Sequence, residues 1–377
     1  MASHGIQSRA LAAKLQGARK GRADGYRLGR SHGYHLGRCQ AVLDRVQPIP
    51  SVKRAIKVMY VEEGTPGFRT LDLGIANSIS VLVQEVKVVP PTSDLTAIAG
   101  EFRPDLILVL NGILRVPNEQ IINLRLHGFR TAVWIMDDPY FTDITASMAP
   151  LYDYIFTHEF NAVPFYQALG CGNVHYLPSG VDRAVVAPRF VERHYRSDVC
   201  FIGSAFPNRI SFFDKVIPAL KGVRLFMAGY GWNQLKHYDA IKQHVNLQGV
   251  LYDDNIKYYI GAKIVINLHR SAEERYNSRR IHAMSVNPRT FEICACGTLQ
   301  LTDIREDLTS HYTPGQELAT FAGPEELVDR IHYYLRHEEE RRRTALGGLH
   351  KTMSQHTYSH RLQAMLLTIF NETGGLV

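Results

Sequence analysis

Short apolar runs alternate with helix-spaced amphipathic stretches over residues 55–180. The most apolar runs, DLILVL at 105–110 and TAVWI at 131–135, have the character of buried strands, while 118–126 and 162–169 carry helical spacing. Strands that alternate with helices predict a parallel sheet covered on both faces. Further strands of this half are expected at 55–61, 80–89, 154–157 and 174–177.

The alternation pauses at PSGVD, residues 178–182, and then begins again. The sequence therefore predicts an α/β protein with two doubly wound, Rossmann-like domains, at 51–180 and 181–350, joined by this linker. Polar residues that follow the strands mark the edge where such sheets bind ligands. In the second half, strands are expected at 199–202, 223–228, 247–250, 264–268 and 299–301, and helices at 209–220, 324–336, 338–353 and 360–370.

Residues 1–50 form a separate arm in which glycine recurs at every fourth position. Each glycine costs about 1 kcal/mol relative to alanine inside a helix. If the arm is helical, the glycines line one groove along which another helix can approach closely. Two interpretations stay open, an oligomerisation or docking helix and a flexible basic tail. The glycines are Gly17, Gly21, Gly25, Gly29, Gly33 and Gly37.

Charge is concentrated in the arm. Residues 1–54 hold 11 Lys/Arg and 2 Asp/Glu, whereas the remaining residues hold 32 basic and 34 acidic side chains. The net charge of +7 therefore does not describe the body of the protein, and we expect no nucleic-acid-binding surface there.

The overall composition is that of a soluble globular protein, with 45% hydrophobic and 21% charged residues. No apolar run approaches the roughly 20 residues of a membrane-spanning helix, and Arg9, Lys14 and Arg19 interrupt any signal-peptide core. Five cysteines without a second pair or a histidine cluster predict neither disulfides nor a zinc site. The expected location is the cytoplasm.

The stretch NPRTFEICACGTLQLT, residues 287–302, carries the most chemistry. A short helix is expected from Pro288, with Gly297 at its end. Asn287, Arg289 and Glu292 then lie near the start of a helix that leads into a buried strand. An ionised carboxylate accepts hydrogen bonds from two adjacent hydroxyls, which suits a sugar. From the residues alone, a packed helix with a dipole-satisfying acid is an equal alternative.

This stretch resembles two related patterns. Its N-x-R-x-F-E-x-x-A-x-G run, from Asn287 to Gly297, resembles the CgeB-like spore maturation family, and E-x-x-x-C-G-T resembles the nucleotide-sugar site of GT-B glycosyltransferases. The resemblance implies two domains facing a cleft, a ribose-binding role for Glu292, a final helix at 351–377 that packs back on the first domain, and no metal. Many retaining members carry another Glu eight residues earlier, where this chain has Met284.

Gly203-Ser204 follows the first strand of the second half and precedes a helix with Arg209. Such a turn lets backbone N–H groups approach a diphosphate, and Arg209 would add an ionic contact. Asn267 and His269 end the strand INLH and are candidates for base, phosphate or sugar, although a strand-end histidine is more often structural. Tyr230 and Trp232 are candidates for a wall that stacks on the base, or for simple packing.

Four acids and one histidine are candidates on the first domain. Asp138, in a W-x-x-D-D-P-Y run that resembles the CgeB-like cleft, is a candidate general base, with structural capping as the alternative. Adjacent Asp137 points the other way on an extended chain, so the pair is not expected to hold one metal ion. Glu63, His158 and Glu159 also follow strands.

The leading interpretation is a metal-independent glycosyltransferase that takes a sugar from a nucleotide-diphosphate sugar, needs no other cofactor, and transfers it to an unknown acceptor. Two alternatives stay open: a nucleotide-sugar epimerase on the same fold, and a non-catalytic scaffold or spore-coat-type protein whose working part is the glycine arm.

Overall fold

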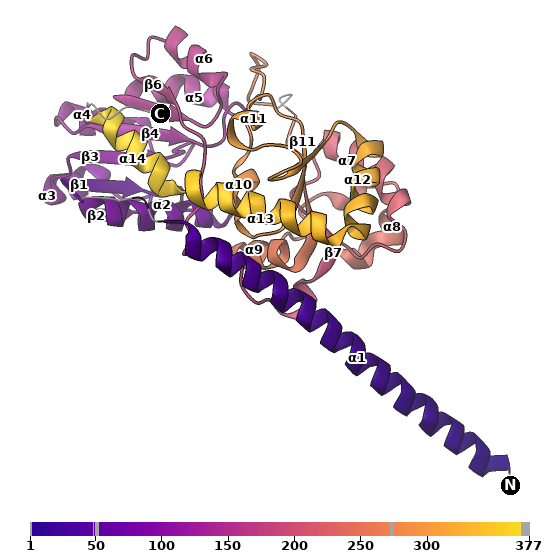
Figure 1. Cartoon of the computed structure of the whole chain (residues 1–377). Helices are drawn as coiled ribbons and strands as arrows, with labels where there is room; N and C mark the ends of the chain where they lie inside the picture. The colour runs from indigo at the N-terminus through magenta and orange to yellow at the C-terminus, as the bar shows by residue number, and fades with distance from the viewer. Residues whose placement is uncertain (1, 48, 50–52, 272–274, 371–377) are drawn as a thin grey trace.

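The computed structural model describes residues 2–47, 49, 53–271 and 275–370, and for 2–13, 28 and 252 the backbone only. Two six-stranded sheets, each parallel throughout, form the core of two α/β domains (Figure 1). This confirms the predicted fold class of two Rossmann-like, doubly wound domains. The strands are β1 (Arg54–Val61), β2 (Val83–Val89), β3 (Leu106–Leu110), β4 (Thr131–Ile135), β5 (Tyr154–Thr157), β6 (Val174–Tyr176), β7 (Ser197–Ile202), β8 (Leu225–Ala228), β9 (Val245–Asn246), β10 (Ala262–Asn267), β11 (Leu299–Asp303) and β12 (Ala319–Phe321).

Strand order shows where each sheet binds ligands. The first sheet runs β2-β1-β3-β4-β5-β6, and the second runs β12-β11-β10-β7-β8-β9. In the second sheet the order reverses between β7 and β10, which is the switch point where open parallel sheets leave a crevice at their carboxyl ends. The central strands β3 and β4 are buried along their whole length, as expected for parallel strands covered by helices on both faces.

The helices follow from amphipathic spacing and local caps. The first domain contains α2 (Arg69–Leu82), α3 (Leu95–Phe102), α4 (Asn118–Leu126), α5 (Thr142–Met148) and α6 (Ala162–Ala168). The second contains α7 (Pro207–Val216), α8 (Tyr238–Ile241), α9 (Tyr252–Gly261), α10 (Pro288–Ala295), α11 (Leu308–His311), α12 (Pro324–Arg336) and α13 (Glu338–Gln355).

The last helix, α14 (Tyr358–Ile369), lies on the first domain (Figure 1). Its buried residues, including Tyr358 and Met365, pack with Trp134 of β4 and Ile75 of α2. Gly74 of α2 leaves room for this contact, since a Cβ there would lie 2.7 Å from the Tyr358 ring. The chain therefore crosses between the domains twice, at 178–182 and again beside Thr357, where Val181 pairs with Thr357.

Two strand predictions need correction, and one strand was missed. Residues 80–82 continue α2, because Ile75, Ile79 and Leu82 share one buried helical face. Residues 247–250 form no strand: β9 lies just before them, and Gly249 turns the chain at φ +73°. The three-residue strand β12 carries too short a pattern to be predicted.

Residues 2–45 form one helix, α1 (Ala2–Arg45), of which only the second half lies on the body (Figure 1). Cys39 and Leu43 are buried against the second domain. The N-terminal part projects away from both domains, and a Cβ placed on any of the six repeat glycines would meet nothing within 4 Å. Among the described residues, no helix combines the length and apolar character needed to cross a bilayer.

Candidate functional site

A cavity of about 430 Å³ lies between the two sheets, at the carboxyl ends of β4, β7 and β8 and the start of α10. Its wall on the second domain includes Gly203, Ser204, Tyr230, Arg289 and Glu292. Its wall on the first domain comes from α2 and from the segments after β4 and β5. The cavity therefore occupies the crevice where parallel sheets bind ligands.

Helix α10 places its charged residues by means of a cap. The Asn287 side chain accepts a hydrogen bond from the Thr290 N–H, and Pro288 opens the first turn. Asn267, fully buried at the end of β10, exchanges hydrogen bonds with Asn287 at 2.9 and 3.1 Å and so fixes the cap. Arg289 and Glu292, three positions apart, then share the face that lines the cavity.

Glu292 has two polar neighbours in the cavity wall, Thr70 of α2 and Arg289 of its own helix. The Arg289 guanidinium attracts the Glu292 charge, and the Thr70 hydroxyl also favours the charged carboxylate. Burial raises the pKa of the Glu292 carboxyl, and these two neighbours oppose the shift. The carboxylate is thus held at the cavity wall with hydrogen-bonding capacity left for hydroxyl groups of a ligand.

Two glycines make the floor beside Arg289. A Cβ on Gly203 would lie 2.8 Å from Arg289 Nη1, and a Cβ on Gly229, at φ +143°, would lie 2.2 Å from the Gly203 carbonyl oxygen. Arg289 Nη1 donates to the Ile202 carbonyl at 2.7 Å. Gly229 requires glycine, because its φ and the Gly203 backbone leave no room for a Cβ, whereas a Cβ on Gly203 would displace two guanidinium groups. Backbone and guanidinium therefore lie close together at this part of the cavity, as suits an anionic group.

The structure places Arg209 away from the cavity, which corrects its expected phosphate role. Its guanidinium is buried and donates to the carbonyl oxygens of Leu268 at 2.7 and 3.1 Å and of Ser204 at 3.0 Å. It therefore holds the end of β10 against the 203–204 turn. Burial lowers the pKa of Arg209, and neighbouring Arg289 adds to that shift.

His269 is likewise structural. Its Nδ1–H donates to Asp303 at 2.6 Å, and its Nε2 accepts from the Asn287 N–H at 3.0 Å. Both ring nitrogens are used, and burial lowers the pKa of the imidazole. His269 and Asn267 thus support Asn287 from behind instead of facing a ligand.

Three further residues lie elsewhere than expected. Trp232 is fully buried against Phe201 and donates to the Gly203 carbonyl at 2.8 Å, so it is not a stacking wall, whereas Tyr230 is 69% exposed and lines the cavity. Gly297 ends α10 at φ +67° and lies under α1, outside the cavity. Glu63 caps the Thr65 N–H at 2.8 Å and does not line the cavity.

Asp137 and Asp138 line the cavity from the first domain but bond to different groups. Asp138 is fully buried and accepts from the hydroxyls of Thr157, at 2.6 Å, and Tyr166, at 2.8 Å. Burial raises the pKa of Asp138 to about 7. Asp137 accepts from Asn111 at 2.8 Å, and Arg270 attracts its charge.

His158 and Glu159 connect the first domain to the loop before α10. Glu159 accepts from the N–H groups of Met284 and Ser285 at 3.2 and 3.1 Å. His158 donates from Nε2 to the Asp138 carbonyl at 2.9 Å, and burial lowers the pKa of His158 to about 4. The carboxylate of Glu159 therefore lies next to the backbone of Met284.

Arg270 and Tyr140 are among the cavity residues that the sequence prediction missed. The Arg270 guanidinium lies 4.3 Å from the centroids of the Tyr140 and Phe206 rings, and so bridges the two domains. Arg270 directly follows His269 just after β10, and a charged residue at the end of a strand could have identified it as a site candidate. Among the described residues, no group of three or more His, Cys, Asp or Glu side chains is arranged to hold a metal ion.

Comparison with known proteins agrees with this architecture. A glycosyl transferase-like family model matches residues 209–367. The spore protein CgeB of Bacillus subtilis is 30% identical over 325 residues, which cover 83% of this chain and the whole of CgeB.

The structure is also similar to solved two-domain proteins. HepE of Anabaena, solved in complex with UDP and glucose, has a TM-score of 0.57 at 12% identity, over 84% of this chain and all of HepE. Sucrose-phosphate synthase of Thermosynechococcus elongatus has a TM-score of 0.58 at 11% identity, over 85% of this chain and all of the synthase chain. A putative UDP-N-acetylglucosamine 2-epimerase of Listeria monocytogenes has a TM-score of 0.55 at 12% identity, over 86% of this chain and all of the epimerase chain. At these identities the likeness concerns the fold, and together with the CgeB match it shows that the chain belongs to the CgeB-like family of GT-B glycosyltransferases.

Proposed function

We propose that the protein transfers a sugar from a nucleotide-diphosphate sugar to an acceptor, with the donor bound in the cavity between the sheets. The observation that supports this most is the common face of α10, where Arg289 and Glu292 meet the glycine floor at Gly203 and Gly229. A guanidinium next to backbone N–H groups that a ligand can approach closely suits a diphosphate. A carboxylate one helical turn away suits a ribose diol. HepE, of the same fold, was solved with UDP and with glucose.

Each donor group has a place in this proposal. Glu292 accepts from the ribose hydroxyls, and Arg289 with the N–H groups of Gly203 and Ser204 holds the diphosphate. Tyr230 borders the base. Arg270, held between two aromatic rings, is a second cation for the phosphate or the sugar. Asn287 caps α10 and is hydrogen-bonded to Asn267, so it holds the start of α10 in place beside these groups.

On the acceptor side, Asp137 is a better candidate base than Asp138. Both oxygens of Asp138 lie within hydrogen-bond distance of the Tyr166 hydroxyl, and Thr157 bonds it as well. Among the described residues, the Asp137 side chain accepts one hydrogen bond, from Asn111, which leaves its second oxygen for an acceptor hydroxyl. We assign His158 and Glu159 to positioning this wall, since their contacts are to backbone groups.

The test is a panel of nucleotide sugars incubated with the protein, with nucleotide release and sugar identity followed together. Slow release from one donor supports a transferase. An isomerised sugar supports the epimerase, which the Listeria neighbour keeps in consideration. Binding of no nucleotide at all supports the scaffold. Turnover that persists in EDTA supports a metal-independent reaction, and its loss on chelation with recovery on adding Mg²⁺ contradicts it.

We further propose that the projecting half of α1 pairs with a second copy, a hypothesis carried by the glycine spacing and the open face along it. Substituting leucine for both Gly21 and Gly25 would block close approach, and light scattering would report a smaller mass. Unchanged mass contradicts pairing. A cytoplasmic location fits the five cysteines, all of which are free thiols.

A further inference from the structure

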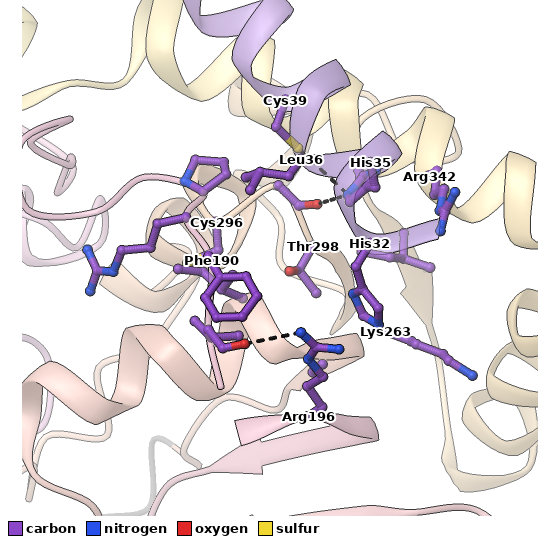
Figure 2. A pocket seen from close by; sticks show the side chains of 18 of the residues that line it. His32, His35, Leu36, Cys39, Phe190, Arg196, Lys263, Cys296, Thr298 and Arg342 are labelled. Atoms are coloured by element: carbon purple, nitrogen blue, oxygen red, sulfur yellow. Dashed lines mark hydrogen bonds between the residues drawn. The ribbon is translucent and has the colours of Figure 1, made fainter. Parts of the chain in front are cut away.

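A second cavity, of about 170 Å³, lies between α1 and the second domain (Figure 2). Its wall is assembled from α1, the 188–191 segment, the starts of β7 and β10, the turn after α10, and α13. No residue of this wall also lines the cavity between the sheets. The proposed glycosyltransferase function leaves it without a role.

The wall combines a compact apolar surface with an excess of cations. Leu36, Val191 and Leu299 are among its apolar residues, and Phe190, 74% exposed, stands at its edge. An apolar protein cavity of about 150 Å³ accommodates benzene, so this space suits a group of that size. The cationic residues are Arg189, Arg196, Lys263, Arg341 and Arg342, and the wall contains no Asp or Glu.

Some of these cations are already paired outside the cavity. Lys263 bonds to Asp198 at 2.8 Å, and Arg342 pairs with Glu338. Arg196 donates from Nη2 to the Val191 carbonyl at 3.2 Å, and its guanidinium lies 5.7 Å from the Phe190 ring centroid. In Figure 2 the Arg196 and His32 side chains approach the same space from opposite sides. Arg196 is thus the cation best placed for a ligand.

Two independent features agree with an anion at this position. Burial is the main cause that lowers the pKa of His32 to about 4, and the nearby cations Arg196, Arg342 and Lys263 add to this shift. Arg196 Nε is buried and has no hydrogen-bond partner among the described residues. Buried polar atoms are almost always satisfied, so a bound group with an acceptor oxygen would explain this donor.

We propose that this cavity binds a small organic anion, a carboxylate or phosphate carried on a compact apolar body, with Arg196 as the main contact of its anionic group. The apolar body lies against Leu36, Val191 and Leu299, and the anionic group faces Arg196 and His32. Because His32 belongs to α1 and Arg196 to the second domain, the ligand fixes the arm on the body and ties the arm's position to the supply of that anion.

The test uses phenyl phosphate and benzoate as probes on the full chain, with affinity measured by calorimetry. Wild type is expected to bind at least one of them, and Arg196→Gln to weaken binding by roughly tenfold, the loss of one charge-assisted hydrogen bond. Arg193→Gln is the matched control, an exposed arginine three residues earlier that does not line the cavity. Lys263→Gln is a second variant on another strand and is expected to weaken binding less.

The outcomes are separable from those of the donor site. Arg289→Gln, which alters the cavity between the sheets, should leave probe binding unchanged; if it weakens binding as Arg196→Gln does, the probe sits in the donor site and the proposal is wrong. Inorganic phosphate should bind more weakly than phenyl phosphate, and equal affinity contradicts the apolar part of the site. No binding of either probe at millimolar concentration, or equal loss in Arg193→Gln, overturns the proposal.

Discussion

Thr70 of α2 in the first domain and Glu292 of α10 in the second line the same cavity, and the Thr70 hydroxyl favours the charged form of the Glu292 carboxyl. A ribose that binds Glu292 therefore meets a carboxylate whose charge is favoured by its neighbours. This arrangement, with Arg289 beside it, makes Glu292 sensitive both to the nucleotide and to the closure of the two domains.

Glu292→Gln is expected to weaken nucleotide-sugar binding by roughly tenfold, because an amide has one acceptor oxygen where the carboxylate has two. Burial raises the pKa of Glu292, so protonation begins at a higher pH than in free glutamate. Wild-type affinity should fall as the pH is lowered from 7.5 to 5. Calorimetry at both pH values checks this, and an equal pH dependence in Glu292→Gln contradicts it.

Gly203→Ala is expected to lower both stability and donor affinity. The new Cβ would lie 2.8 Å from Arg289 Nη1 and 3.0 Å from Arg209 Nη1, and such overpacking costs about 1–3 kcal/mol. Gly172→Ala is the control, since nothing lies within 4 Å of its Cβ, and it should change stability by less than about 0.5 kcal/mol. Denaturant unfolding and donor titration measure the two effects.

Arg209→Met and Arg289→Met should behave in opposite ways. Removing the buried Arg209 guanidinium leaves the Leu268 carbonyl without its donors, whereas the Ser204 carbonyl keeps the Phe206 N–H. A buried group left unsatisfied costs about 1–3 kcal/mol of stability. Arg289→Met should spare stability more and weaken donor binding more. Unfolding curves and binding on the folded fraction separate the two, and a large binding loss in folded Arg209→Met would restore its phosphate role.

Asp138→Asn is expected to change how stability depends on pH. Burial raises the pKa of Asp138 from 3.8 to about 7, so the folded state holds a proton that the unfolded state releases above about pH 4. Asp138 therefore contributes stability that is present at low pH and is lost as the pH rises through 7. Between pH 5 and 8.5, the free energy of unfolding of the wild type should fall by on the order of 2 kcal/mol more than that of the Asn variant. Parallel curves contradict the raised pKa.

The sequence was sufficient for the central strands and for α10. Runs such as 105–110 and 131–135 are apolar because both faces of a parallel strand are buried, and Asn287 with Pro288 marks a helix start in any context. Both signals are local. They place the polar residues that follow them at the correct edge of each sheet.

Side-chain roles were harder to predict because they depend on distant partners. Arg209 and His269 look like ligand residues in sequence, yet their bonds go to Leu268, 59 positions away, and Asp303, 34 positions away. The φ of Gly297 was predictable from its place after a helix, but the close approach of Cys39 from α1 was not. No local pattern distinguishes a buried structural arginine from one that faces a ligand.

The paired crossing between the domains has a mechanical consequence. Val181 N–H donates to the His356 carbonyl at 3.1 Å, and the Tyr358 N–H donates to the Val181 carbonyl at 2.8 Å, so outgoing and returning chains are bonded side by side. A twin-stranded hinge bends far more readily than it slides or twists. Opening and shutting of the two lobes should therefore follow a single rotational axis through this crossing, and a protease cut in one strand alone would leave the lobes joined by the other.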